Sequence, residues 1–208
     1  MAPRARTIRE VEIKIRISDL PALLERLRVL GASAPVLVFE QNVLYDARDS
    51  DFRRRGQLLR LRIESPATDR SLRHISKDIR PGKSRAILTS KVPVADAQQT
   101  RFKEKLETEV VVRDPAAWQR AVQGLGLREG FRYEKYRASF RFGSAHLDVD
   151  ETPVGVFLEI EGRPSSINRI ARRLGFAPSD YIRATYWELY AADCRRRGRK
   201  MGNMLFDA

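Results

Sequence analysis

One pattern recurs three times in this chain: a Glu-x-Glu pair on a strand-like stretch, then an amphipathic helix pattern that ends in Leu-Gly. The three pairs are Glu10/Glu12, Glu107/Glu109 and Glu159/Glu161. Residues i and i+2 of a strand point to the same face, so each pair presents two carboxylates side by side with apolar residues opposite. Carboxylates this close repel one another. Three such pairs therefore favour a site that holds cations, anions or both.

Hydrophobic periodicity predicts an α+β fold of roughly eight strands and four helices. Alternation predicts strands at residues 9–17, 36–46, 58–63, 85–91, 105–112, 133–141, 146–150 and 156–161. Helical spacing predicts helices near residues 20–30, 115–125, 167–174 and 184–196. Most strands follow one another directly along the chain. This order favours an antiparallel sheet that is large enough to curl or close.

The chain shows no linker, so we expect one domain over residues 1–195. Residues 196–208 include Gly202, Asn203 and Asp207, and we expect them to form a frayed C-terminal tail. Residues 65–84 contain two prolines, a glycine and many basic residues, which predicts an extended hairpin or a mobile loop.

Charge and composition narrow the class of protein. Forty Lys and Arg against 27 Asp and Glu give a formal charge of +13, which attracts polyanions without choosing among them. The single cysteine, Cys194, excludes an intramolecular disulfide and a cysteine-based metal cluster. The N-terminus lacks the apolar core of a signal peptide, and no apolar run approaches the length of a membrane span. We expect a cytoplasmic protein.

The charged faces of the predicted strands allow two interpretations. An alternating strand usually turns its apolar side inward and its charged side to solvent. Here, however, the charges form same-sign pairs two residues apart, which gain nothing locally. The pairs are Arg60/Arg62, Lys135/Arg137, Asp148/Asp150 and two of the Glu-x-Glu pairs. If these faces converge on a wet interior, the carboxylates can bind divalent cations and the basic pairs can bind phosphate.

Other chemistries have weaker support. His74 and His146 have no cysteine or histidine at ligand spacing, which argues against zinc. The sequence contains no G-x-x-x-x-G-K-[ST] loop, no G-x-G-x-x-G and no G-x-S-x-G elbow.

Seven segments, in order, resemble the motifs of the CYTH superfamily, the triphosphate tunnel metalloenzymes. Glu10-Val-Glu12-Ile-Lys14 resembles the ExExK signature of this family. The other segments are Leu59-Arg60-Leu61-Arg62, Ile87-Leu88-Thr89-Ser90-Lys91, Lys105-Leu106-Glu107-Thr108-Glu109, Glu134-Lys135-Tyr136-Arg137, the Asp150-to-Gly162 block and the segment from Asp180 to Leu189. The resemblance covers nearly the whole chain and is strongest to bacterial class IV adenylate cyclase-like and thiamine triphosphatase-like proteins.

The resemblance implies a closed eight-stranded antiparallel β-barrel, or tunnel, with a charged lumen and helices packed outside. It implies Mg²⁺ or Mn²⁺ bound by Glu10, Glu12, Asp150, Glu159 and Glu161. It implies triphosphate bound by Lys14, Arg60, Arg62, Lys91, Lys135 and Arg137, with Lys77 as an alternative to Lys91. Glu107 and Glu109 are expected in the lumen without an assigned role. Asp148 matches no motif of the family, and we expect it at the lumen mouth.

The resemblance also implies an activity: conversion of ATP to cyclic AMP and pyrophosphate. The alternative is a triphosphatase that hydrolyses thiamine triphosphate or inorganic triphosphate. A second alternative is a non-enzymatic protein that binds nucleic acid or another polyanion, but few aromatic residues accompany the basic pairs. We expect a small-molecule nucleotide or triphosphate as the partner, no membrane and no nucleic acid, and a homodimer remains an option.

Overall fold

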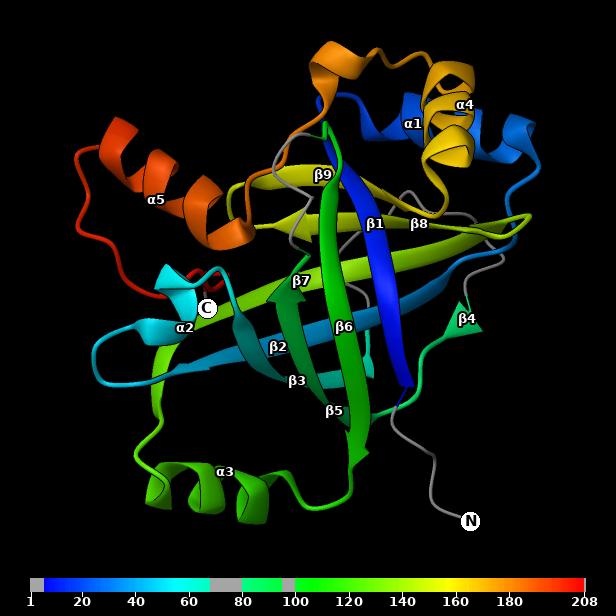
Figure 1. The fold of residues 1–208 in the computed structure, drawn as a ribbon. Coiled ribbons are helices and arrows are strands. Elements are labelled where there is room, and N and C mark those ends of the chain that lie inside the picture. The colour runs from blue at the N-terminus through cyan, green and yellow to red at the C-terminus, as the bar shows by residue number, and fades with distance from the viewer. Residues whose placement is uncertain (1–5, 68–79, 95–99, 208) are drawn as a thin grey trace.

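Eight strands close into an antiparallel barrel in the computed structural model, which describes residues 6–67, 80–94 and 100–207. The strands neighbour one another in the order β3-β5-β6-β1-β9-β8-β7-β2, and β2 pairs back to β3 to close the sheet. Figure 1 shows β1, β5 and β6 crossing in front of β2 and β7. The predicted α+β fold with a closed barrel is confirmed.

The strands of the barrel lie close to their predicted positions. They are β1 (Arg6–Ile17), β2 (Val36–Asp46), β3 (Leu58–Pro66), β5 (Arg85–Pro93), β6 (Lys103–Val112), β7 (Arg128–Phe142), β8 (Ala145–Thr152) and β9 (Gly155–Glu161). A two-residue strand, β4 (Arg80–Pro81), pairs in parallel with the start of β2. Part of the segment predicted as a hairpin or loop therefore returns along β2, while residues 68–79, with Lys77, lie outside the described residues.

The first three helices connect strands of the barrel, and the last two follow its final strand. They are α1 (Leu20–Leu30), α2 (Asp51–Arg54), α3 (Pro115–Gly124), α4 (Pro164–Arg173) and α5 (Tyr186–Arg196), with a 3₁₀ turn at Pro178–Asp180. Asp19 caps α1 by accepting a hydrogen bond of 3.0 Å from the Ala22 amide, and Gly31 ends it in the left-handed conformation at φ 85°. Among these helices, none is both long and apolar enough to cross a bilayer.

The largest apolar core lies outside the barrel wall, beneath α1 and α4. Ile13 and Ile15 of β1 pack there with Leu27 of α1 and Ile170 of α4, and all four are at most 1% exposed. Burial of this apolar surface is the main favourable contribution to folding. It also fixes the orientation of β1, because the residues that alternate with these isoleucines must then point into the barrel.

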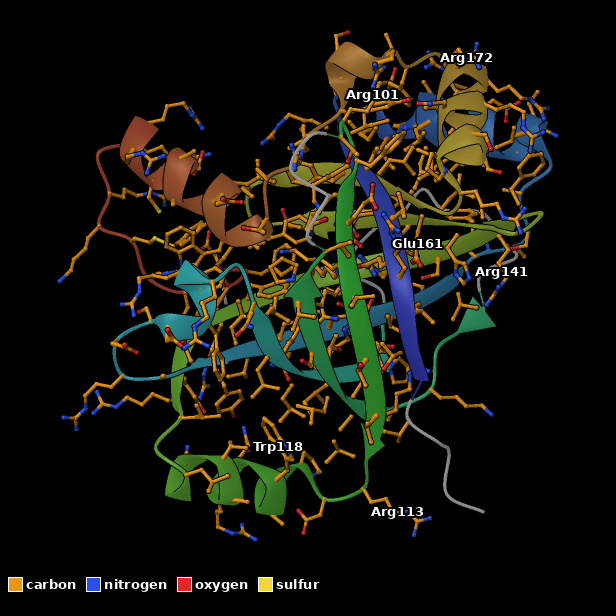
Figure 2. All side chains as sticks on the ribbon, in the orientation of Figure 1. Arg101, Arg113, Trp118, Arg141, Glu161 and Arg172 are labelled. Atoms are coloured by element: carbon orange, nitrogen blue, oxygen red, sulfur yellow. The ribbon has the colours of Figure 1, made fainter. Side chains whose placement is uncertain are left out.

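Two smaller apolar clusters lie beneath α3 and beneath α5. Figure 2 labels Trp118 on α3. Its ring contacts the ring of Tyr45 on β2, with centroids 5.0 Å apart. Beneath α5, Phe131, Tyr186 and Met204 belong to a second cluster, which lies between this helix and the barrel. The helices α1, α3 and α4 thus pack on apolar outer faces of the strands, and the charged faces are left to the interior. The cluster under α5 lies at an end of the lumen, because its Phe131 and Tyr186 also line the cavity.

The prediction of a frayed tail at residues 196–208 is wrong for the described residues after α5. Met204 is fully buried, its amide donates to the Arg132 carbonyl at 2.9 Å, and its carbonyl accepts from the Glu134 amide at 2.9 Å. One apolar side chain and two strand-like hydrogen bonds hold the segment against β7. A single buried methionine leaves no periodic signal in the sequence.

Candidate functional site

The barrel encloses a cavity of about 1980 Å³ that is lined by charged side chains from all eight strands. One lining residue from each of the eight is Glu10, Glu40, Arg60, Lys91, Glu107, Lys135, Asp148 and Glu159. Several of these charges are almost inaccessible: Lys14 and Lys135 are each 2% exposed. The interpretation of solvated charged faces is therefore wrong, and the charged faces converge on the interior.

The structure brings together most of the residues that the sequence singled out. The cavity lining includes Glu10, Glu12, Lys14, Arg60, Arg62, Lys91, Glu107, Glu109, Lys135, Arg137, Asp148, Glu159 and Glu161. Lys91 is thus in the lumen, as the motif match predicted. Figure 2 marks Glu161 beside β1, and Glu161 is the register partner of Glu12 across the β1–β9 ladder.

Six glutamates of β1, β6 and β9 line one side of the cavity, together with lysines. We call this side the carboxylate wall: Glu10, Glu12, Glu107, Glu109, Glu159 and Glu161. The Lys91 ammonium lies 2.6 Å from Glu10 and 3.2 Å from Glu107. The Lys103 ammonium lies 2.5 Å from Glu12. In the same way, Lys14 lies 2.6 Å from Glu159. Carboxylates that would repel one another are held together by lysines placed between them.

The carboxylate wall holds more negative charge than its lysines offset. Burial raises the pKa of Glu10 to about 7, and Glu12 and Glu107 add to the rise, while Lys91 opposes it. Burial likewise raises the pKa of Glu161 to about 7, with a further contribution from Glu10. Glu12 behaves differently: burial acts to raise its pKa, but Lys103 and other lysines lower it to about 2. Glu10 and Glu161 therefore mark the place where an added cation would be most favourable.

The charge on Glu161 predicts a pH dependence of stability. A carboxyl whose pKa is higher in the folded chain binds more protons when folded, so ionisation of Glu161 should destabilise the fold as pH rises from 4.5 to about 7. We expect Glu161→Gln to stabilise the metal-free protein by about 1 kcal/mol at pH 8, after allowance for solvent screening, and by little at pH 5. Thermal unfolding in EDTA at both pH values checks this. An equal shift at both would show that the charge is not responsible.

The opposite part of the cavity is rich in arginine and lysine, and we call it the cation wall: Arg60, Arg62, Lys135 and Arg137, from β3 and β7. Arg60 is 6% exposed, and its guanidinium donates to Thr89 at 3.1 Å and to the Tyr133 hydroxyl at 3.2 Å. Guanidinium groups fixed in this way offer preoriented donors to phosphate oxygens.

Asp150, which was predicted to bind metal, lies behind the cation wall instead of lining the cavity. It is fully buried, and its two oxygens accept from Lys135 at 2.9 Å, from Arg137 at 2.6 and 2.7 Å, and from the Tyr186 hydroxyl at 2.6 Å. Because its oxygens already have four donors, the structure favours a role in holding Lys135 and Arg137. Asp148, two residues earlier, faces the cavity.

Interior residues that were missed from the sequence include Glu40, Lys103 and Tyr186. Glu40 lies on a strand whose polar face was not identified, and Lys103 precedes the predicted start of its strand at residue 105. Tyr186 belongs to a motif segment but had no role. Its ring lies 4.5 Å from the Lys14 ammonium, a cation–π contact at the end of the lumen under α5. Residues 36–46 do not alternate cleanly between polar and apolar types, so the available signal for Glu40 was the two-residue period of a strand, which places it on one face with Asn42.

The donor set of the carboxylate wall fits a hard divalent ion, since it consists of carboxylate oxygens. Within the described ranges, no three Asp, Glu, His or Cys side chains are grouped as a ready-made metal site. Lysines occupy the positions between them, as Lys91 does with Glu10 and Lys103 does with Glu12. Glu10, Glu12, Glu159 and Glu161 would hold an ion only when these lysines turn toward another anion.

Known proteins share both the sequence pattern and this fold. The family model described as "CYTH domain" matches residues 9–186. A protein of Methanocaldococcus jannaschii named "putative adenylate cyclase" is 26% identical over 191 residues, which cover 86% of this chain and 97% of that protein. A structure from Vibrio parahaemolyticus, also called a "putative adenylate cyclase", superimposes with a TM-score of 0.69 at 18% identity and covers 88% of this chain and 97% of that one. A Hippeastrum structure, described as revealing "a dominant triphosphatase activity", has a TM-score of 0.52 at 15% identity over 92% of this chain and 97% of that one. Since the domain model spans most of the sequence, the chain belongs to the CYTH family.

Proposed function

We propose that this protein is a divalent-metal-dependent enzyme that acts on a triphosphate inside the tunnel, and that it converts ATP to cyclic AMP and pyrophosphate. The observation that carries the proposal is the enclosed lumen in which a cation wall faces a carboxylate wall. Buried charges are costly unless something compensates them. A triphosphate between the two walls would complete the compensation on the cation side, and a divalent ion would do so on the carboxylate side.

The cation wall would bind and orient the phosphates. A triphosphate carries about four negative charges, and Arg60, Arg62, Lys135 and Arg137 present donors in a site largely shielded from water. Preoriented donors in such surroundings stabilise developing negative charge more strongly than water does. Lys14 and Lys91, now paired with Glu159 and Glu10, can turn to phosphate oxygens when these carboxylates bind an ion.

The carboxylate wall would hold the ion through Glu10, Glu12, Glu159 and Glu161. When bound, a divalent ion would supply positive charge that offsets the charge of the phosphates, and it would favour deprotonation of the attacking group. In a cyclase the attacking group is the ribose 3′-hydroxyl, which displaces pyrophosphate from the α-phosphorus.

A triphosphatase is the second candidate, in which water attacks the terminal phosphate within the same lumen. It is supported by the activity named for the Hippeastrum structure, which belongs to that protein. Product analysis separates the two candidates. Incubation with ATP, inorganic triphosphate and thiamine triphosphate should release pyrophosphate and cyclic AMP from ATP if the protein is a cyclase. Release of phosphate alone would favour the triphosphatase.

Chelation provides a test of the metal. Because the donors are oxygen atoms, we expect Mg²⁺ and Mn²⁺ each to restore activity after treatment with EDTA. Turnover should fall to the background rate in excess EDTA and return when either ion is added back. Full turnover in excess EDTA would contradict the metal-dependent proposal.

A further inference from the structure

Glu40 of β2 is a fully buried carboxylate in the middle of the cation wall, and the family motifs give it no role. Its Oε2 atom lies 3.5 Å from Arg62 Nε and 3.5 Å from Lys135 Nζ. Its Oε1 atom lies 3.7 Å from Arg137 Nε. Glu40 is thus an anion shared among three cations that the proposed function assigns to phosphate.

Each of these cations has a closer partner elsewhere. Arg62 lies 3.3 Å from Glu64, Lys135 lies 2.9 Å from Asp150, and Arg137 lies 2.6 Å from Asp150. The contacts to Glu40 are longer, so it acts on the three cations through its charge more than through direct hydrogen bonds.

Polar atoms around Glu40 also remain without hydrogen-bond partners. Among the described residues, Glu40 Oε1, Asn42 Oδ1 and the Nε atoms of Arg60 and Arg62 are buried and make no hydrogen bond. Asn42 does donate to Glu40 Oε2, at 3.3 Å. Buried polar groups normally have hydrogen-bond partners. A buried group without such a partner calls for an explanation, such as a role in binding a ligand or water. The two arginine Nε groups can donate to phosphate oxygens, whereas the negatively charged Glu40 oxygen repels phosphate oxygens.

We propose that Glu40 is a positioning residue that spaces and partly neutralises the cation wall in the ligand-free protein, and thereby limits how tightly the tunnel holds a phosphate chain. This inference rests on the proposed function. Although burial opposes ionisation, the surrounding Arg62, Lys135 and Arg137 hold the pKa of Glu40 well below its usual range, so the carboxylate keeps its charge. A bound triphosphate therefore meets a fixed negative charge behind its cations.

The charge of Glu40 should affect the stability of the free protein and the binding of triphosphate in opposite directions. Without ligand, Glu40 offsets repulsion among the cations and stabilises the fold. With ligand, the triphosphate provides this compensation, and Glu40 weakens its binding. Removing the charge should therefore destabilise the free protein and tighten triphosphate binding, whereas a merely structural role would only lower stability.

The test compares wild type with Glu40→Gln, which keeps the shape, and Glu40→Asp, which keeps the charge. Glu129→Gln is the control, because Glu129 pairs with Arg132 outside the cavity lining. Binding of inorganic triphosphate is measured by calorimetry in EDTA, with thermal unfolding in the presence and absence of triphosphate. We expect Glu40→Gln to bind triphosphate about tenfold more tightly, because the variant loses the repulsion between one negative charge and phosphates several ångströms away. Without ligand, it should unfold at a lower temperature than wild type. Glu40→Asp and the control should bind triphosphate with an affinity within about twofold of wild type, because both keep the negative charge at position 40.

Unchanged or weaker binding by folded Glu40→Gln would overturn the inference while leaving the proposed function intact. Absence of triphosphate binding by wild type, both in EDTA and with added Mg²⁺, would instead contradict the proposed function. If Glu40→Gln does not fold, Arg62→Gln is compared with the Arg62→Gln/Glu40→Gln double variant, in which the charges balance. Tighter binding by the double variant supports the inference, and equal or weaker binding overturns it.

Discussion

Glu159→Gln should lower kcat at least about a hundredfold, equivalent to about 2.7 kcal/mol of transition-state stabilisation. Glu159 lies at the junction of the two walls, where it contacts both Lys14 and Arg137. Loss of its charge removes one proposed ligand of the ion and frees Lys14 from its partner. Because Lys14 is buried, the variant should also be less stable, so steady-state kinetics belong well below its unfolding temperature.

The matched control for this variant is Glu129→Gln on β7, which removes an ion-paired glutamate outside the cavity lining. It should retain wild-type kcat and KM. Wild-type turnover by Glu159→Gln would remove the carboxylate wall from the mechanism.

Asp150→Asn should destabilise the metal-free protein by about 3–5 kcal/mol, the usual cost of breaking a buried ion pair. The fully buried Asp150 accepts from Lys135, Arg137 and Tyr186. Asparagine would leave Lys135 without its closest anion and would remove one of the anions around Arg137. Denaturant unfolding in EDTA measures this loss. Tyr186→Phe removes only one neutral donor and should cost about 1 kcal/mol.

The same experiment decides between two roles for Asp150. A positioning role predicts the stability loss without any metal present. A variant with wild-type stability in EDTA but no activity with Mg²⁺ would support the metal-ligand role that the family resemblance implies.

The sequence predicted the barrel strands well because their alternation is a local signal. Ile13 and Ile15 alternate with Glu12 and Lys14, and the structure puts the first pair in the outer core and the second in the lumen. The same-sign pairs two residues apart left both an inward and a solvated direction of the charged faces open, and the inward direction was implied by the family resemblance. The short elements α2 and β4 were missed, because four residues and two residues contain too little periodicity to predict.

The partners within the lumen could not be predicted, because they depend on sheet order and closure. Lys91 meets Glu10 across two neighbouring strand pairs, β5–β6 and β6–β1, that no local pattern specifies. Asp150 and Asp148 share a strand face in the sequence, yet only Asp148 lines the cavity. The reason is Tyr186 of α5, which lies 36 positions along the chain and donates its hydroxyl to Asp150.

Binding of inorganic triphosphate at two salt concentrations tests the central proposal most directly. Lumen cations are shielded by the barrel wall, so we expect micromolar-range affinity that changes little between about 50 and 200 mM salt. Contacts of an exposed basic surface with duplex DNA would instead weaken by orders of magnitude over the same range. Triphosphate binding should survive 200 mM salt, and DNA binding should be weak and salt-sensitive. Tight DNA binding at 200 mM salt, with no measurable triphosphate affinity, would contradict the central proposal.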